Sequence, residues 1–138
     1  MSGEFLDTTI LVYAFDRDAG SKRSAARDLV DRLAQEESGL LSIQVLMELF
    51  AVLTRKFSAR IRPSDVATII ESLSAWTIHS PLPLDVIDAV RIAAAYRISP
   101  WDASIVQSAS ALGATKIWSE DFSAGQRYEG IPVENPFA

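Results

Sequence analysis

Apolar residues along the chain occur in two alternating patterns, short continuous runs and longer stretches with helical spacing. The short runs predict buried strands, and the stretches with apolar residues three and four positions apart predict helices. Their alternation predicts an α/β fold, a three-layer α/β/α sandwich around a mainly parallel sheet of four to five strands. The expected strands lie at residues 5–6, 40–41, 76–79, 114–118 and 131–133.

The boundaries of the helices follow from residues that start or stop them. Ser42 and Ser99 can cap helices, Pro63 and Pro100 suit first turns, and Gly113 suits a helix end. In the last apolar run, Pro132 lacks a backbone N–H, so we expect that strand at an edge of the sheet. The expected helices follow Thr9 and Ser21, run from Ser42 to about Lys56, begin at Pro63, and occupy residues 85–97 and 100–112.

One carboxylate interrupts the first apolar run. Asp7 follows Phe5 and Leu6, and a second apolar run begins at Ile10. Desolvating an unpaired carboxylate costs several kcal/mol, so Asp7 needs solvent, a partner or a metal ion. We expect a buried strand to deliver it to the carboxyl edge of the sheet, where parallel sheets place active sites. Capping of the following helix explains Asp7 alone about equally well.

Three further acids occupy comparable positions. Glu48 is the only formally charged residue of its helix before Arg55, and Asp102 falls in the first turn of a later helix. Asp121 follows the strand expected at 114–118. A surface position for Glu48 and a favourable helix-dipole contact for Asp102 are structural alternatives. Strand ends and helix starts gather at one edge of a parallel sheet, so all four acids are expected to converge there.

The chemistry of such a cluster follows from charge. Four carboxylates cannot lie together in ionised form without a compensating positive charge. The chain has no cysteine and a single histidine, which leaves oxygen ligands and favours a hard cation, Mg²⁺ or Mn²⁺. Such an ion can activate a water and stabilise charge on a phosphoryl group, so phosphodiester hydrolysis is the expected reaction.

Length, charge and composition narrow the class of protein. The 138 residues suit a single domain, residues 1–138. The net charge of -5 argues against nucleic-acid binding through overall positive charge, but is compatible with an acidic site that holds cations. The absence of cysteine, of a signal-like start and of a membrane-length apolar run favours a cytoplasmic protein with no membrane contact. No nucleophile-elbow pattern accompanies the single histidine, His79, so a Ser-His-Asp hydrolase is poorly supported.

The acidic motifs resemble those of the PIN-domain ribonucleases, specifically the VapC-type toxins of prokaryotic toxin–antitoxin pairs. The resemblance covers nearly the whole chain and rests on segments 5–13, 42–49, 101–106 and 119–121. It implies a PIN-like domain with Mg²⁺- or Mn²⁺-dependent endoribonuclease activity that leaves 5′-phosphate and 3′-hydroxyl ends. By motif position, the metal-binding and catalytic acids would be Asp7, Glu48, Asp102 and Asp121.

The resemblance also implies secondary roles and partners. Ser119 would position substrate or Asp121. Thr9, which stands where the family often has Asn, would also position substrate. Among the basic residues that could contact RNA, which are Arg55, Lys56, Arg60 and Arg62, Arg55 is the expected positioning residue. The implied partners are an RNA substrate, a second copy in a homodimer, and a small VapB-like antitoxin whose C-terminal segment blocks the acidic groove.

Two other functions remain open from the sequence. A phosphoryl-transfer enzyme would phosphorylate Asp7, but a phosphatase of the haloacid dehalogenase type needs a second Asp where this chain has Thr9. A catalytically silent PIN-like binding module would keep the fold without the chemistry. The presence of all four acids argues against the silent module.

Overall fold

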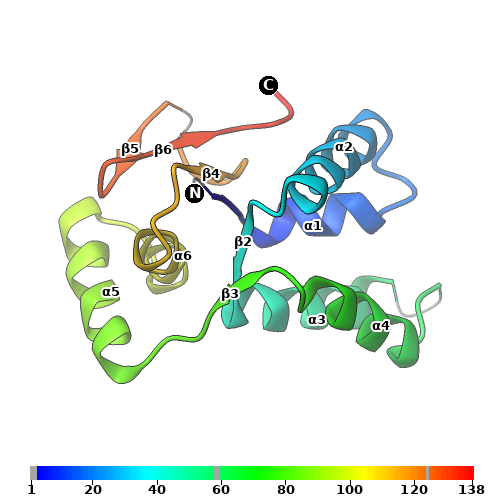
Figure 1. The fold of residues 1–138 in the computed structure, drawn as a ribbon, viewed down its shortest axis with the longest axis horizontal. Coiled ribbons are helices and arrows are strands. Elements are labelled where there is room, and N and C mark those ends of the chain that lie inside the picture. The colour runs from blue at the N-terminus through cyan, green and yellow to red at the C-terminus, as the bar shows by residue number, and fades with distance from the viewer. Residues whose placement is uncertain (1–2, 58–59, 124) are drawn as a thin grey trace.

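The computed structural model describes residues 3–57, 60–123 and 125–138, and in them six helices flank one six-stranded sheet (Figure 1). The strands are β1 (Glu4–Leu6), β2 (Gly39–Ser42), β3 (Thr77–His79), β4 (Lys116–Trp118), β5 (Arg127–Tyr128) and β6 (Ile131–Glu134). The helices are α1 (Thr8–Phe15), α2 (Ser21–Glu36), α3 (Ile43–Lys56), α4 (Pro63–Leu73), α5 (Pro83–Tyr96) and α6 (Pro100–Ala111).

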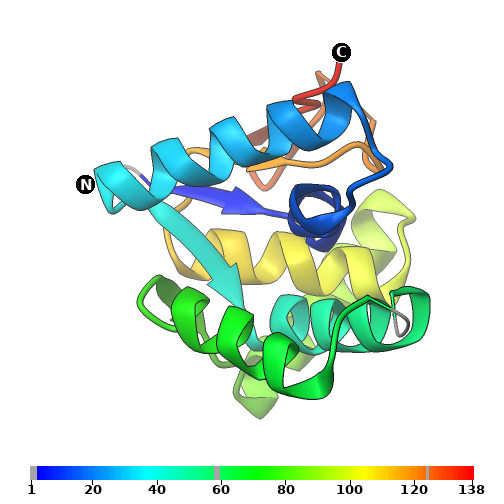
Figure 2. The ribbon, with the colours of Figure 1, turned by 90° about the vertical axis from the view of Figure 1, so that its right-hand side faces the viewer.

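The sheet has the order β3-β2-β1-β4-β6-β5, and every pairing is parallel except that of β5 with β6. Helices α1 and α2 lie on one side of the strands, with α5 and α6 on the other (Figure 1). In the view turned by 90°, β1 lies between α2 and α6 (Figure 2). Helix α3 packs against α1, and α4 packs against α3. The predicted three-layer arrangement around a mainly parallel sheet is confirmed.

Two details of the predicted sheet differ from the structure. The sheet has a sixth strand, the two-residue β5, which is too short to leave an apolar pattern in the sequence. The expectation that Pro132 marks an edge strand is wrong, because β6 lies between β4 and β5. The missing N–H of Pro132 is tolerated because pairing with β4 begins one residue later, at Val133. On the other side, the Val133 N–H donates to the carbonyl oxygen of Gln126 at 3.1 Å.

The central strand, β1, is fixed on both sides. Phe5 and Leu6 are fully buried, and the strand pairs in parallel with both β2 and β4. In β2, Gly39 allows close packing, because a Cβ there would lie 2.1 Å from a ring atom of Trp76. The carboxyl end of β1 is therefore held in place by its neighbours, and the chain enters α1 directly at Asp7.

Helix α3 presents two different faces. Its buried face includes Val45, Leu49 and Leu53, whereas Met47 and Phe50 are exposed. Burying a Leu side chain stabilises a fold by about 1.5–3 kcal/mol, so the buried face is sufficient to hold the helix against the core. No helix of the described residues is both long and apolar enough to cross a membrane.

Candidate active site

A pocket of about 150 Å³ lies beyond the carboxyl ends of the central strands, where α1, α3 and α6 meet. We call it the acidic pocket, because all four of the predicted acids line it. They come from four separate elements, the ends of β1 and β4 and the helices α3 and α6. Its lining consists of Asp7, Thr8, Thr9, Val12, Gln44, Glu48, Val52, Trp101, Asp102, Ile105 and Asp121.

Asp7 is the most deeply placed of these acids, with 6% of its surface exposed. It is the N-cap of α1, where its Oδ1 accepts a hydrogen bond from the Thr8 N–H at 2.7 Å. Its Oδ2 accepts from the Ser119 hydroxyl, also at 2.7 Å. The capping role suggested by the sequence therefore holds together with a position in the acidic pocket.

Burial dominates the ionisation of Asp7. Desolvation raises its pKa to about 6, although the hydrogen bonds from Ser119 and Thr8 act in the opposite direction. The negative charges of Asp121 and Glu48 raise the pKa further. This carboxylate lacks a positive partner among the described side chains, which is the situation in which a cation binds favourably.

Glu48 is held by two hydrogen bonds in the acidic pocket. The Thr8 hydroxyl donates to its Oε2 at 3.1 Å, and Gln44 Nε2 donates to its Oε1 at 2.6 Å. Gln44 Nε2 also lies 3.2 Å from the Trp101 carbonyl oxygen at the start of α6. The side of α3 that carries Gln44 and Glu48 thus faces the first turns of α1 and α6.

The two remaining acids lie nearer to solvent. Burial raises the pKa of Asp102, a hydrogen bond with Ser99 lowers it, and the charge of Glu48 raises it again. Asp121 is exposed at the rim. Its pKa is raised by partial desolvation and then by the nearby charges of Glu120 and Asp102. Burial is the largest cause of the raised pKa values of Asp7, Asp102 and Asp121, and the charges of neighbouring carboxylates add to it in each case.

Ser119 connects two of the acids. Its side chain is fully buried, and its hydroxyl both donates to Asp7 and accepts the Asp121 N–H at 3.0 Å. The hydroxyl of Thr9 is buried and has no hydrogen-bond partner among the described residues. Arg55 lies outside the pocket, exposed in the last turn of α3. It is about 10 Å from Glu48 along the helix axis, given the rise of about 1.5 Å per residue.

The donor set fits a hydrated hard cation. Within residues 3–57, 60–123 and 125–138, no three His, Cys, Asp or Glu side chains lie close enough to form a metal cage by themselves. Mg²⁺ keeps several of its waters and is usually bound through one or two carboxylates, so a cage of protein ligands is not required. The uncompensated carboxylates and the unpartnered Thr9 hydroxyl are suited to such an ion and its waters.

A Ser-His-Asp trio lies elsewhere, but it is not built for catalysis. His79 Nδ1 lies 2.8 Å from the Ser108 hydroxyl, and His79 Nε2 lies 3.5 Å from a carboxylate oxygen of Asp85. Ser108 is 1% exposed, so its hydroxyl cannot meet a substrate. Asp85 also accepts hydrogen bonds from the Leu82 N–H and from Gln107 Nε2, so these contacts join α5 to α6.

Some residues that line the pocket were not expected from the sequence, among them Thr8 and Trp101. Thr8 positions Glu48 across the pocket, and Trp101 forms an exposed part of the wall. Thr8 left no signal beyond its place next to Asp7, because its partner lies 40 residues away in the chain. The available signal for Trp101 was its place directly before Asp102 in the sequence.

Comparison with known proteins gives a family and a fold. The family model for the PIN domain matches residues 5–126. The structure is similar to DNA-bound VapBC from Salmonella typhimurium, with TM-score 0.69, 19% identity, and 99% of each chain covered. It is also similar to a toxin–antitoxin complex from Klebsiella pneumoniae, with TM-score 0.69, 22% identity, and 98% of each chain covered.

A third similar structure is VapC20 from Mycobacterium tuberculosis, described as a toxin that cleaves the sarcin–ricin loop. Its TM-score is 0.69 at 18% identity, with 94% of this chain and 99% of that chain covered. The comparison with curated proteins found no match. At these identities the solved structures establish the fold, whereas the family model spans most of the sequence. The chain belongs to the PIN domain family.

Proposed function

We propose that this chain is a Mg²⁺- or Mn²⁺-dependent endoribonuclease and the toxin of a type II toxin–antitoxin pair. The observation that carries the proposal is the acidic pocket, in which four carboxylates from separate elements line one small cavity. Family membership supports it, because these acids lie on the motifs by which the sequence resembles PIN-domain ribonucleases.

Asp7 and Asp102 are the proposed direct metal ligands, with Glu48 and Asp121 acting through water or a second ion. Bound there, the cation would supply Lewis acidity and a water of lowered pKa. The hydrogen bonds from Thr8 and Ser119 fix both oxygens of Asp7, so that its orientation does not depend on the ion.

The other residues position rather than react. Gln44 and Thr8 hold the Glu48 carboxylate in place. The Ser119 hydroxyl links the Asp7 carboxylate to the backbone N–H of Asp121. The unpartnered Thr9 hydroxyl is the proposed contact for a substrate oxygen or an ordered water. Arg55, outside the pocket, is the proposed contact for the more distant part of the RNA.

The substrate and partners are proposed from the similar structures. VapC20 is described as cleaving the sarcin–ricin loop, which supports RNA as the substrate class. The Salmonella and Klebsiella structures contain toxin–antitoxin complexes, which supports a small VapB-like antitoxin covering the acidic pocket. We further propose a homodimer that acts in the cytoplasm, where its RNA substrate is found.

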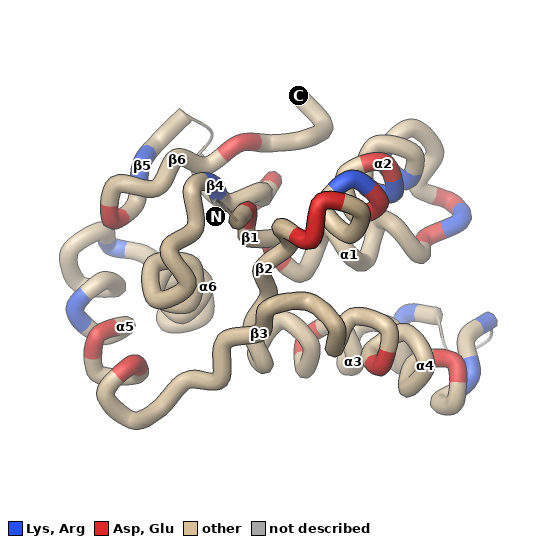
Figure 3. The backbone as a smooth tube through the Cα atoms, in the orientation of Figure 1, with Lys and Arg blue, Asp and Glu red and all other residues tan. Residues whose placement is uncertain are grey.

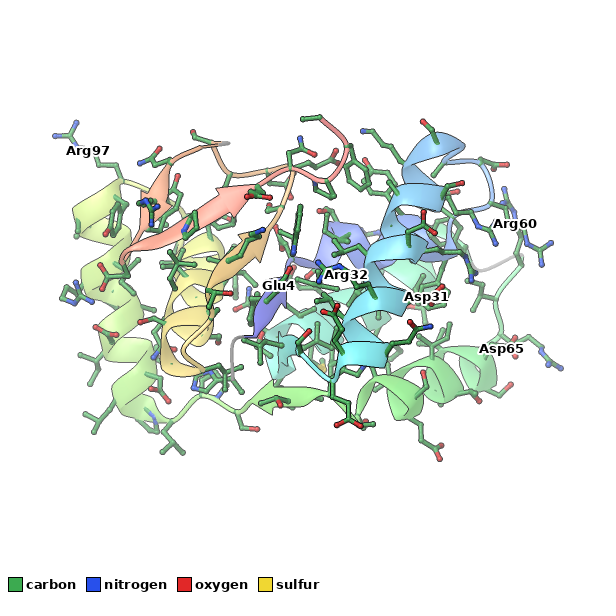
Figure 4. The ribbon with its side chains drawn as sticks, turned by 45° about the horizontal axis from the view of Figure 1, so that its top comes forward. Glu4, Asp31, Arg32, Arg60, Asp65 and Arg97 are labelled. Atoms are coloured by element: carbon green, nitrogen blue, oxygen red, sulfur yellow. The ribbon has the colours of Figure 1, made fainter. Side chains whose placement is uncertain are left out.

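The test is RNA cleavage by the purified protein with Mg²⁺ or Mn²⁺, followed by EDTA. We expect cleavage that EDTA abolishes and that fresh metal restores. Asp102→Asn should remove cleavage, since it takes a charged ligand from the pocket while conserving shape. The matched control is Asp31→Asn, which makes the same chemical change at an exposed position of α2 (Figure 4).

A titration with Mn²⁺ separates this proposal from its alternatives. A saturable site in the wild-type protein that weakens in Asp102→Asn supports the metal-dependent enzyme. The absence of any saturable site would indicate the silent binding module. Transfer of a phosphoryl group to Asp7 would indicate the phosphoryl-transfer enzyme.

A further inference from the structure

A second pocket, of about 200 Å³, lies at the other end of α1. It is formed by the end of α1, the connection to α2, the first half of α2, and the segment that follows α3. We call it the arginine pocket, since four of its seven lining residues are arginines and none is acidic. The lining consists of Phe15, Arg17, Arg23, Arg27, Phe57, Arg60 and Ile61.

The positive charge of this pocket is mostly uncompensated. Within the described part of the chain, Arg17, Arg23 and Arg27 form no ion pair with a carboxylate, whereas Arg60 pairs with Asp18 at 2.8 Å. Figure 3 shows basic segments on the two connections at this end of the molecule, between α1 and α2 and between α3 and α4, and it shows acidic segments on either side of the basic one between α1 and α2. A chain with a net charge of -5 thus concentrates arginines at one place.

One hydrogen-bond donor of an arginine that lines the pocket is left without a partner. The Nε of Arg23 is buried, and it has no hydrogen-bond partner among the residues that the structure describes. Buried donors are nearly always paired, so an unpaired one needs an explanation such as a missing ion or ligand. Arginine does not lose its proton in proteins, so this N–H stays a donor beside the pocket that lacks an acceptor among the described residues.

We propose that the arginine pocket binds a backbone phosphate of the RNA strand whose cleavage takes place in the acidic pocket. This inference rests on the proposed ribonuclease function. Guanidinium groups bind phosphate oxygens through forked hydrogen bonds, and here several of them surround one cavity. The cavity is much larger than the space of one water, so it can admit a phosphate group.

The placement of the two pockets favours RNA over an acidic protein segment. Both pockets lie along α1, the acidic one at Asp7, Thr8 and Val12 and the arginine one at Phe15. From Thr8 to Phe15 the helix advances about 10 Å. At about 3.4 Å per nucleotide of stacked strand, that distance corresponds to roughly three nucleotides. A strand cut in the acidic pocket can therefore place a neighbouring phosphate among the arginines.

The experiment measures binding of a fluorescently labelled ten-nucleotide single-stranded RNA in EDTA, by anisotropy, with RNA integrity checked on a gel. Arg23→Gln and Arg27→Gln remove one pocket charge each. Arg97→Gln is the matched control, because Arg97 is exposed and lies at the opposite end of the molecule from Arg60 (Figure 4). Thermal unfolding shows whether each variant is folded, and Arg27→Gln, at an exposed position, keeps the test valid if Arg23→Gln unfolds.

We expect each pocket variant to bind the RNA about 5- to 10-fold more weakly than wild type, with Arg97→Gln changing affinity less than twofold. The slope of log K against log salt should fall by about 0.7, because one phosphate of the RNA is no longer neutralised by the protein. In the wild-type protein, inorganic phosphate should also shift the NMR signal of the Arg23 Nε–H.

Equal affinities for wild type and both pocket variants would overturn the proposal, as would an equal loss in Arg97→Gln. Preferential binding of poly-glutamate over RNA in the arginine pocket would also overturn it and identify an acidic protein segment as the occupant. Because binding is measured without metal and without cleavage, its outcome is independent of whether the protein proves to be a ribonuclease.

Discussion

The acidic pocket and the arginine pocket lie along the same helix and carry opposite charges, but they hold those charges differently. In the acidic pocket, Asp7 is short and buried, and two hydrogen bonds fix it. In the arginine pocket, long side chains converge from the α1–α2 connection, from α2 and from beyond α3. One pocket is therefore rigid and set by the backbone, whereas the other depends on flexible side chains.

The two pockets also differ in how they can be neutralised. A carboxylate whose pKa is raised to about 6, as for Asp7, can take up a proton when no cation is present. An arginine has no corresponding option at any physiological pH. The acidic pocket can therefore be neutralised by a proton or, in the proposed function, by a cation, while the arginine pocket needs an anion. Variants and ligands that act on one pocket alone should expose this difference, with effects that range from a loss of cleavage to small thermal shifts.

Asp7→Asn should distinguish most clearly the role of the acidic pocket in cleavage from the role of the arginine pocket in RNA binding. We expect cleavage of RNA in Mn²⁺ to fall by at least about 10³-fold, more than the 10- to 100-fold typical of losing an outer-shell partner. Binding of RNA in EDTA should be unchanged or tighter, since a negative charge is removed and the arginines remain. Cleavage kinetics and fluorescence anisotropy on the same preparation measure the two quantities. A large loss of RNA binding in EDTA would contradict the view that the two pockets act separately.

Ser119→Ala should weaken the acidic pocket without removing a charge. Its hydroxyl bonds both Asp7 and the Asp121 N–H, so we expect Mn²⁺ affinity and cleavage to fall about 10- to 100-fold. Ser123→Ala, at an exposed position in the same segment, serves as the control. Isothermal titration with Mn²⁺ gives the affinities, and equal values for the two variants would remove Ser119 from the positioning role.

The pH dependence of stability should show that the Asp7 carboxylate lacks a positively charged partner. Its pKa is raised from 3.8 to about 6 in the folded protein, so the folded state binds more protons than the unfolded state between these values. The free energy of unfolding therefore falls as pH rises through this window, by up to about 3 kcal/mol. Carboxylates with lowered pKa values, such as Glu4 and Glu129, act in the opposite direction at lower pH.

The measurement is urea unfolding in EDTA at pH 4, 5, 6 and 7 for wild type and Asp7→Asn. The difference between the two proteins isolates Asp7, and we expect Asp7→Asn to be the more stable at pH 7. Saturating Mn²⁺ should remove the advantage of the variant. A difference that does not change with pH would show that Asp7 titrates normally.

The smallest effect expected is a pair of thermal shifts. Mn²⁺ and inorganic phosphate should each raise the melting temperature by a few degrees, through the acidic and the arginine pocket respectively. Because the pockets are about 10 Å apart along α1, the two shifts should add. Differential scanning fluorimetry with each ligand and with both tests this, and Arg27→Gln should lose only the phosphate shift.

The sequence was sufficient for the three-layer arrangement around a mainly parallel sheet and for the four acids of the acidic pocket. Asp7, Glu48, Asp102 and Asp121 each interrupt or begin an element, and parallel strands bring such positions to one edge. The apolar periodicity of the sequence predicts the parallel sheet, and the parallel sheet brings the four acids into one pocket. Their role as metal ligands stays a prediction, which RNA cleavage and titration with Mn²⁺ can test.

The arginine pocket could not be predicted in the same way. The sequence draws attention to the basic stretch around Arg55, Arg60 and Arg62, yet only Arg60 lines the pocket. Arg62 pairs instead with Asp65 at the start of α4. The other arginines lie on and before α2, and their approach to Arg60 depends on how α1, α2 and α3 pack. Local periodicity does not show which helices pack together, so it cannot predict this approach. It also cannot predict β5, because a strand of two residues leaves no periodic pattern.

The two hydrogen bonds on Asp7 limit how many ions it can hold. A carboxylate offers about four lone-pair directions, two on each oxygen. The Thr8 N–H occupies one on Oδ1 and the Ser119 hydroxyl occupies one on Oδ2. One direction remains on each oxygen, enough for one ion held by both oxygens or for two ions held by one each. Asp7 therefore sets an upper limit of two on the stoichiometry of cations that it contacts.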